Sequence, residues 1–332
     1  MPDVGIMLVL IVVFALAFDY INGFHDTANA IATVVSTRVM TPLQAIIMAA
    51  VLNFAGALVA TRVAHTIASG IIDTHAASET VVLAAIVGGI VWNLVTWVYG
   101  IPSSSSHAII GGLCGAGAAH AGLVAVQWNG LLKKVVIPLV ASPVAGFVFG
   151  LIVMTVITML FHNAHPRRAG GAFRQLQRVS AAAMAFSHGQ NDAQKSMGVI
   201  TLALFTHGLT KSTDVPVWVI LACASVMALG TAAGGWRIIA TMGHKIMRLE
   251  PVNGFAAETS GASVILIASY LGIPVSTTHV LAGSILGVGA SKRLNAVRWT
   301  VAQRMVVAWF LTIPAAATVG GLTYFLLNAA HL

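Results

Sequence analysis

Charged side chains are scarce in this chain: only 8% of its 332 residues are Asp, Glu, Lys or Arg. Soluble domains carry a much larger share, about 25%. Hydrophobic residues instead make up 58% of the sequence, and the mean hydropathy is +0.91. The composition excludes a separate soluble domain and predicts a protein built for the lipid bilayer.

Cysteine is nearly absent as well. Cys114 and Cys223 have no partners at the spacing of metal ligands, so we interpret both as packing residues. The sequence also lacks a Glu-x-x-His pair and anything that resembles a nucleophile elbow. These absences predict no resident metal and no cofactor, and they disfavour both an intramembrane enzyme and a transporter that binds cations alone. We therefore expect a protein that is not an enzyme.

The apolar residues gather in runs separated by short loops, which is typical of an all-α, polytopic integral membrane protein. The runs lie near residues 4–18, 42–60, 81–100, 131–161, 197–206, 215–235, 259–273 and 299–327. The first run lacks the basic flank and cleavage site of a signal peptide, so we expect it to be a retained span. The pI near 10 would suggest a nucleic-acid partner in a soluble protein. Here the basic residues lie in loops, and no nucleic acid is expected.

One polar cassette occurs twice. The first copy pairs NGFHDTAN (residues 22–29) with GIPSSSSHAIIGGLCGAG (100–117), and the second pairs SHGQNDAQK (187–195) with GIPVSTTHVLAGSILGVG (272–289). A polar or charged group in hydrocarbon costs on the order of a few kcal/mol unless it faces a cavity. A duplicated set of such groups therefore predicts a binding site between two related halves.

Each half is expected to contain a re-entrant helical hairpin. Residues 79–118 comprise an apolar stretch, a Gly-Ile-Pro break, four serines and a second apolar stretch too short for a full span. Non-helical backbone at this depth requires protein or water around it. If the hairpin returns to its starting side, the first half crosses the membrane an odd number of times, which makes the halves inverted repeats. We predict an N-terminal repeat at 1–161, a short cytoplasmic linker at 162–178 and an inverted C-terminal repeat at 179–332.

The distribution of basic residues predicts the orientation, because cytoplasmic loops are rich in Lys and Arg. With alternate loops assigned to opposite sides, the richer side holds Arg38, Arg167, Arg168, Arg174, Arg178, Arg237, Lys245, Arg248, Lys292, Arg293, Arg298 and Arg304. The poorer side holds Arg62, Lys133, Lys134 and Lys211. This bias places both termini outside.

Polar side chains on the first span recur at alternating steps of three and four residues, which places them on one stripe of a helix. The stripe consists of Asp19, Asn22, Asp26, Asn29, Thr33 and Ser36. In the second half, His188, Asp192 and Lys195 repeat the spacing of Asn22, Asp26 and Asn29, so inverted halves would bring two polar faces together at mid-membrane. We assign Asp26, Asp192 and Lys195 to function. Asn22, Thr33 and Ser36 fit hydrogen bonds between helices equally well.

The two Ser/Thr clusters indicate an anion. Residues 103–106 are expected to cap a half-helix that begins near His107, and residues 276–278 to cap one that begins near His279. A helix start offers free N–H groups and partial positive charge, so two facing starts predict a site for an oxyanion. His107 and His279 fit either buried neutral histidines bonded to a carbonyl or a substrate or proton site. Glu79 and Glu258, at the hairpin entrances, fit either a cation or proton site or a simple interfacial carboxylate.

The charge at such a site requires a coupling ion. Two carboxylates and one ammonium leave it near minus one, and a divalent oxyanion would take it near minus three. At ~5 Å and an effective dielectric constant near 20, each pair of like charges repels by about 3 kcal/mol. The anion must arrive with cations, so the electrostatics predict symport, with Lys195 as a fixed cation in place of one coupling ion.

These motifs resemble the inorganic phosphate transporter (PiT) family, and in particular its bacterial low-affinity permeases. The resemblance is carried by GFHDTANAIAT, FSHGQNDAQKSMG, PSSSSH and PVSTTH, and it runs from about Asp19 to the last span. It implies a secondary active transporter of the cell inner membrane that carries inorganic phosphate inward by symport. Such relatives often form homodimers. The join at 161–178 is shorter than the large insertion of many relatives.

The resemblance also implies which cations and residues take part. Lys195 stands where sodium-dependent members typically carry Asn, which favours H⁺ over Na⁺ as the coupling ion and fits transport of phosphate as a complex with a divalent metal. Some members look like sulfate permeases, so sulfate is the alternative substrate, although an ionised aspartate can accept a proton only from phosphate. The expected substrate contacts are Asp26, Asn29, Ser104, Ser105, Ser106, Asp192, Lys195, Ser276, Thr277 and Thr278. The candidates for the coupling ion or proton are Asp26, Asn22, Asn191, Asp192, Glu79, Glu258, His107 and His279.

Overall fold

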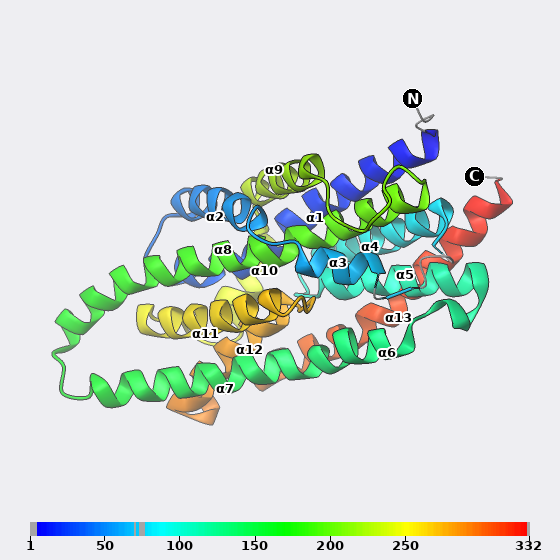
Figure 1. The fold of residues 1–332 in the computed structure, drawn as a ribbon. Coiled ribbons are helices and arrows are strands. Elements are labelled where there is room, and N and C mark those ends of the chain that lie inside the picture. The colour runs from blue at the N-terminus through cyan, green and yellow to red at the C-terminus, as the bar shows by residue number, and fades with distance from the viewer. Residues whose placement is uncertain (1–4, 70, 73–76, 331–332) are drawn as a thin grey trace.

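The computed structural model describes residues 5–69, 71–72 and 77–330. Within these ranges the chain is almost entirely helical and has no strand beyond one isolated bridge, so the predicted all-α class is confirmed (Figure 1). In chain order the helices are α1 (Ile6–Ser36), α2 (Pro42–Ala57), α3 (Arg62–Ser69), α4 (Glu79–Tyr99), α5 (Ser105–Ala121), η1 (Leu123–Ala125), α6 (Trp128–Leu131), η2 (Leu132–Val136), α7 (Ile137–Leu160), α8 (Pro166–Thr206), α9 (Val217–Ala233), α10 (Trp236–Ala240), η3 (Thr241–Lys245), α11 (Pro251–Tyr270), α12 (Thr277–Lys292), η4 (Leu294–Ala296) and α13 (Trp299–Ala329).

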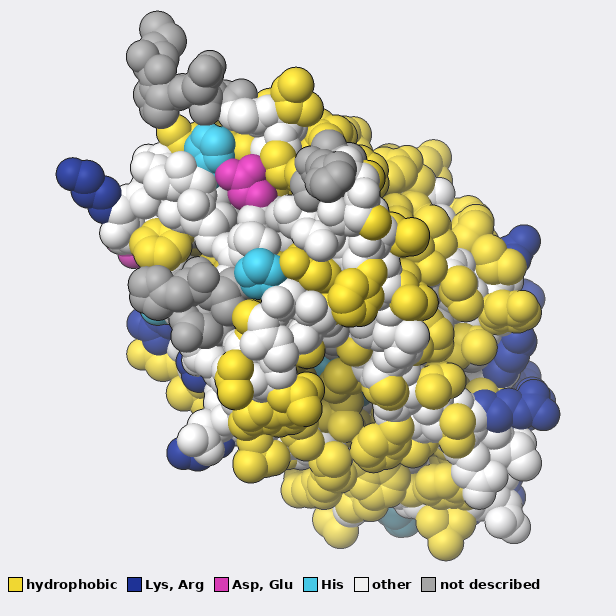
Figure 2. All heavy atoms as spheres, turned by 90° about the vertical axis from the view of Figure 1, so that its right-hand side faces the viewer, with side chains coloured by type: hydrophobic (Ala, Val, Ile, Leu, Met, Phe, Trp, Pro, Cys, Tyr) yellow, Lys and Arg dark blue, Asp and Glu magenta, His cyan; other side chains and the backbone are white. Residues whose placement is uncertain are grey.

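Within the described residues, four helical units are long and apolar enough to cross a membrane: α1, α4, the continuous run from α6 to α7, and α13. Two bent pairs, α2 with α3 and α9 with α10 and η3, raise this number to six if each pair is one span. Large hydrophobic side chains such as Val51, Val144 and Val307 are exposed on the flanks of the bundle. Figure 2 shows a broad hydrophobic flank with Lys and Arg at the margins of the view. This is the surface of a multi-pass membrane protein.

The runs predicted near residues 42–60 and 215–235 continue into broken helices. α2 begins at a capping box formed by Thr41 and Gln44, and α3 turns away from it by 67°. α9 ends at Gly234, whose φ of +75° suits glycine, and the next helical segment turns by 61°. Hydropathy does not reveal these breaks, because the apolar composition continues up to the bend.

Most of the linker predicted at residues 162–178 is helical in the structure. Only residues 161–165 connect α7 to α8, because Pro166 occupies the first position of a helix of 41 residues. At 1.5 Å per residue such a helix extends about 60 Å, which is twice the hydrocarbon thickness of ~30 Å, so part of α8 protrudes from the bilayer. The basic residues at its start hide the helix from a search for apolar periodicity.

Two helical hairpins, α4 with α5 and α11 with α12, position the Ser/Thr clusters. Each hairpin turns at a glycine with positive φ, +62° at Gly100 and +69° at Gly272. A Cβ on Gly115 of α5 would lie 2.0 Å from a carbonyl oxygen of α13, and one on Gly287 of α12 would lie 1.9 Å from a carbonyl oxygen of α7. These glycines therefore let each hairpin pack against the other half at close backbone distance.

The contacts between the two halves are reciprocal. α1 packs on α9 and α2 on α8, while α5 packs on α13 and α12 on α7. Each contact thus has a counterpart in which the halves exchange roles. The start of α1 and the end of α13 lie at the same end of the bundle (Figure 1). This reciprocity supports an internal repeat, and the inverted orientation of the halves and the re-entrant depth of the hairpins stay predictions.

Candidate anion-binding site

Four elements meet in the interior of the bundle: α1, α8 and the first turns of α5 and α12. The polar stripe predicted on α1 is shielded from the surface, and the following side chains are each at most 2% exposed: Asp19, Asn22, Asp26, Asn29 and Thr33. Asp192 and Lys195 on α8 are equally buried. Buried groups of this polarity must find their partners inside the protein.

The first hairpin tip joins the two charged helices. α5 begins at Ser105, two residues earlier than predicted, and Ser104 caps it by accepting a hydrogen bond from His107 N at 3.2 Å. The Ser105 hydroxyl donates to Asp26 Oδ2 at 2.8 Å and accepts from Lys195 Nζ at 2.9 Å. One hydroxyl therefore bridges an acid of the first half and the ammonium of the second.

The second hairpin tip has the matching arrangement. Ser276 caps α12 by accepting from His279 N at 3.3 Å, so α12 also begins two residues earlier than predicted. Thr277 Oγ1 donates to Asp192 Oδ2 at 3.3 Å. Asn29 Nδ2 donates to the hydroxyls of Thr277 and Thr278 at 3.2 and 2.8 Å. The predicted meeting of both tips with both acidic faces is present.

The two tips also contact each other directly. Ser106 Oγ donates to the carbonyl oxygen of Val275 at 3.0 Å, and the rings of His107 and His279 lie 5.1 Å apart. The ring of His279 stacks on Trp309 at 4.1 Å. Among the described residues, neither nitrogen of His279 has a hydrogen-bond partner, so the carbonyl-bonded arrangement considered from the sequence is not formed there.

Two histidines extend the site beyond the predicted set. His25 Nδ1 lies 2.6 Å from Asp26 Oδ1, and His188 Nε2 lies 3.3 Å from Asp192 Oδ2. His188 also reaches Asn53 on α2, at 3.1 Å. The His-Asp dipeptide at 25–26 and the four-residue spacing of His188 and Asp192 are the signals that could have revealed them.

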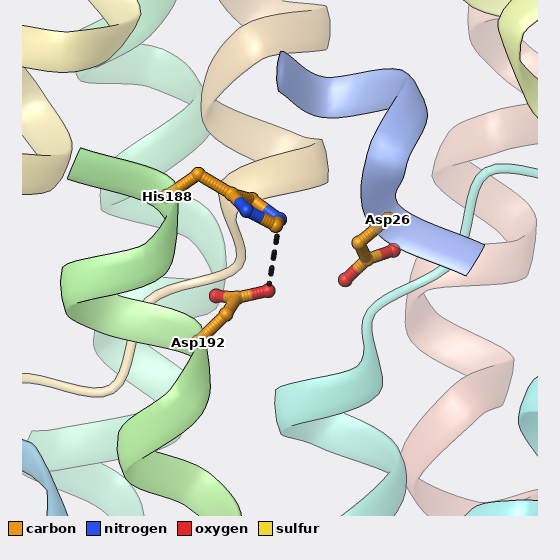
Figure 3. A group of neighbouring side chains, drawn as sticks. All are labelled: Asp26, His188 and Asp192. Atoms are coloured by element: carbon orange, nitrogen blue, oxygen red, sulfur yellow. Dashed lines mark ion pairs between the residues drawn. The ribbon is translucent and has the colours of Figure 1, made fainter. Parts of the chain in front are cut away.

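Figure 3 shows Asp26 facing His188 and Asp192 across the gap between α1 and α8. One ligand atom from each of the three residues lies within 4.8 Å of the other two. Two carboxylates and an imidazole are donors that suit a divalent transition-metal ion. The sequence predicted no metal site, whereas the fold gathers a set of side chains able to hold a cation.

The other candidates for the coupling ion form no hydrogen bond with the tips among the described residues. Glu258 is fully buried and accepts hydrogen bonds from Thr33, Gln177 and Ser180, so it is not a simple interfacial carboxylate. Glu79, at the start of α4, pairs with His207. The remaining two are Asn191, which donates to Ser269, and Asn22, which has no hydrogen-bond partner among the described residues.

Helix starts, hydroxyls and paired acids meet inside a membrane-spanning bundle, which is the arrangement of membrane transporters with a site between broken helices. The chain belongs to the phosphate transporter family, whose model matches residues 22–320. It is a membrane transporter rather than an enzyme, as predicted.

Individual relatives agree with this membership. A probable low-affinity inorganic phosphate transporter of Bacillus subtilis (strain 168) is 51% identical over 97% of this chain and 98% of its own length. A protein described in the same words from Rhizobium meliloti (strain 1021) is 50% identical over 96% of both chains. The fold is similar to that of a solved sodium-dependent phosphate transporter, with a TM-score of 0.91 over 98% of this chain and 100% of the other at 24% identity.

Proposed function

We propose that the protein is a cation-coupled secondary transporter that carries inorganic phosphate. The observation that carries this proposal is the meeting of two capped helix starts between Asp26 and Asp192, with Ser105 and Lys195 at hydrogen-bond distance. An oxyanion placed there would accept from the hydroxyls and the ammonium. A protonated phosphate oxygen would donate to an aspartate, which fully deprotonated sulfate cannot do. The names of the relatives point to the same substrate.

The neighbouring histidines sharpen the proposal for the coupling ion. Asp26, Asp192 and Lys195 together leave a charge near minus one, which opposes a divalent anion. His25 and His188 each contact one of the carboxylates and can each hold a proton. We infer that protons on these Asp/His pairs balance the incoming phosphate, and Na⁺ is the alternative coupling cation.

A divalent metal that travels with phosphate fits the same place. The triad of Asp26, His188 and Asp192 supplies two carboxylates and an imidazole, and a metal held there would be cargo rather than a resident cofactor. Lys195 competes with such an ion, because its ammonium lies 2.9 Å from Asp192 Oδ2. A metal–phosphate complex therefore requires Lys195 to turn from Asp192 toward the phosphate.

The proposal extends to the setting of the protein. We infer a location in the cell inner membrane with both termini outside, because the basic loops predict this orientation. Glu79, Glu258, Asn22 and Asn191 stay candidates for further steps in cation transfer. A homodimer also stays a prediction.

Reconstituted uptake tests the proposal. Proteoliposomes receive labelled phosphate under an imposed proton gradient, an imposed sodium gradient or neither, with and without Mg²⁺, and unlabelled sulfate is added as a competitor. We expect uptake driven by the proton gradient, little competition by sulfate, and stimulation by Mg²⁺ if the metal complex is carried. Uptake that ignores both gradients and added Mg²⁺ would contradict coupling, and equal competition by sulfate would contradict phosphate selectivity.

A further inference from the structure

A second cluster of positive charge lies away from the central site. A cavity of about 560 Å³ opens where α1 and η3 end and α13 begins. Arg38, Arg248, Arg298 and His244 line it, and no acidic side chain does so among the described residues. These residues come from separate segments of the chain, so the fold itself gathers them around one space.

The cavity lies at the opposite end of the bundle from the start of α1 and the end of α13. It adjoins the end of α1 at Ser36 and the start of α13 at Trp299, and each of these helices has 31 residues. A helix of that length extends about 46 Å, which is the full thickness of a bilayer. The cavity therefore opens on the membrane face that is predicted to be cytoplasmic.

Arg38 and Arg298 form backbone hydrogen bonds, but in the described part of the chain the guanidinium groups of the arginines of this cavity have no hydrogen-bond partner. Their guanidinium groups form no ion pair there, although an exposed arginine elsewhere can hold a backbone carbonyl, as Arg62 and Arg237 do. Guanidinium groups that share a cavity without a counter-charge repel one another. An anion in the cavity would relieve this repulsion and satisfy N–H donors.

A polar path connects the cavity with the hairpin tips. Thr37, in the cavity wall, donates to Gln177, and Gln177 donates to Glu258. Glu258 also accepts from Thr33, which lies one turn of α1 from Asn29 and its bonds to the second tip. The cavity is thus the outer end of a series of buried hydrogen-bonding groups.

We propose that this cavity is a second anion site, which binds a phosphoryl oxyanion supplied as free inorganic phosphate. Guanidinium groups match phosphate oxygens with paired N–H donors, and three of them offset the charge of a dianion. The source of the ligand depends on the proposed function, whereas the chemistry of the cavity does not. An anionic lipid headgroup presents the same phosphoryl group, so the two sources must be separated experimentally.

The experiment uses the full chain in nanodiscs of phosphatidylcholine, with or without phosphatidylglycerol. The background variant is Lys195→Gln, which weakens the central site. The cavity variant adds Arg248→Gln and Arg298→Gln, and a conservative version carries Lys at both positions. The matched control adds Arg167→Gln and Arg168→Gln, which remove two exposed arginines from the start of α8. Equilibrium dialysis measures binding of labelled phosphate, and native mass spectrometry measures retained phosphatidylglycerol.

We expect the background protein to retain a class of phosphate binding that weakens with added salt, because the arginines are exposed. The cavity variant should bind this phosphate about tenfold more weakly, the Lys version less so, and the control unchanged. Another outcome is that the cavity variant alone loses phosphatidylglycerol retention while its phosphate binding is unaltered. That result would keep the cavity as an oxyanion site, but its ligand would be the lipid headgroup and not free phosphate. Equal behaviour of cavity variant and control toward both ligands would overturn the site. Failure of the parent to take up phosphate would contradict the proposed function without affecting this comparison.

Discussion

The two halves of the central site match in geometry and differ in charge. Asp26 and Asp192 each accept a hydrogen bond from a first-turn hydroxyl of their own hairpin, Ser105 or Thr277. The side chain three residues after each aspartate reaches the hairpin of the opposite half, and it is an amide in the first half and an ammonium in the second. The repeat therefore fixes where groups lie, while single residues decide what charge they carry.

The two hairpin turns are held by contacts from short helices, which we call the frame of the site, and this frame is alike in both halves. Thr66 on α3 donates to the carbonyl of Gly272 at 2.8 Å, and Thr241 on η3 donates to the carbonyl of Gly100 at 3.0 Å. One arginine at the start of each short helix supports the same turn through a further carbonyl. Each hairpin is thus held by the broken helix of the opposite half. Both hairpin turns are therefore held in the same way, each by its own set of contacts, while the charges at the centre differ between the halves.

The largest expected effect is a difference in stability between variants of Asp192 and Asp26. Asp192→Asn would leave the ammonium of Lys195 buried without a carboxylate, which should cost about 3–5 kcal/mol of stability. Asp26 contacts the imidazole of His25 and the hydroxyl of Ser105 rather than an ammonium, so the loss from Asp26→Asn should be about 1–2 kcal/mol. Unfolding in detergent measures both, and phosphate uptake should be lost in both. Addition of Lys195→Met to Asp192→Asn should restore stability but not uptake, and equal destabilisation by the two single changes would contradict the unequal pairing.

The next effect comes from making the halves chemically equal. Lys195→Asn places in the second half the residue that the first half has at the matching position, Asn29. Loss of the charged donor should reduce proton-driven phosphate uptake by at least a factor of about ten, or make uptake depend on Na⁺. Lys292→Asn, at an exposed ion pair with Glu250, is the control and should transport normally. Behaviour of Lys195→Asn like that of the parent would reject Lys195 as a substitute for a coupling ion.

The polar stripe and both hairpin tips could be predicted because duplication and helical spacing are local properties of the sequence. Asp26, Asp192 and the tip hydroxyls needed only the repeat and the N-cap rule to be singled out. The pairing of Asn29 with Thr277 could not be predicted, because it links residues 248 positions apart and depends on how the halves are rotated against each other.

The contacts that surrounding helices make with the site could not be predicted from the sequence for a related reason. Asn53 is an isolated polar residue in the apolar part of α2, and only the packing of α2 on α8 shows that it meets His188. The sequence also predicts a linker where α8 is one continuous helix, because basic residues interrupt the apolar pattern of its first part. Such features depend on tertiary contacts rather than on local periodicity.

A smaller effect is expected at the tips themselves. Ser105→Ala removes the bridge between Asp26 and Lys195, and Thr277→Val removes the bridge between Asp192 and Asn29. Each variant leaves a buried charged group one hydrogen bond short, which should raise the KM for phosphate about five- to tenfold and cost about 1–3 kcal/mol of stability. Initial uptake rates over a range of phosphate concentrations give this value.

The control for the tips is Thr318→Val, which removes an exposed hydroxyl that bonds only within α13. It should leave KM unchanged. If Thr277→Val raised KM while Ser105→Ala did not, the first tip would lie outside the phosphate site and the match between the halves would be limited to geometry.

The smallest expected effect concerns the frame. Arg62→Gln removes the donor to Tyr270 O, and Arg237→Gln removes the donor to Val98 O. Because both arginines are exposed, each change should cost no more than about 1 kcal/mol of stability. Hydrogen exchange should nevertheless rise locally, at residues 270–275 for Arg62→Gln and at residues 98–103 for Arg237→Gln, because each variant releases only the turn that its arginine supports. Faster exchange in both turns from either single change would mean that the hairpins open together, and unchanged exchange in both would mean that the arginines do not hold them.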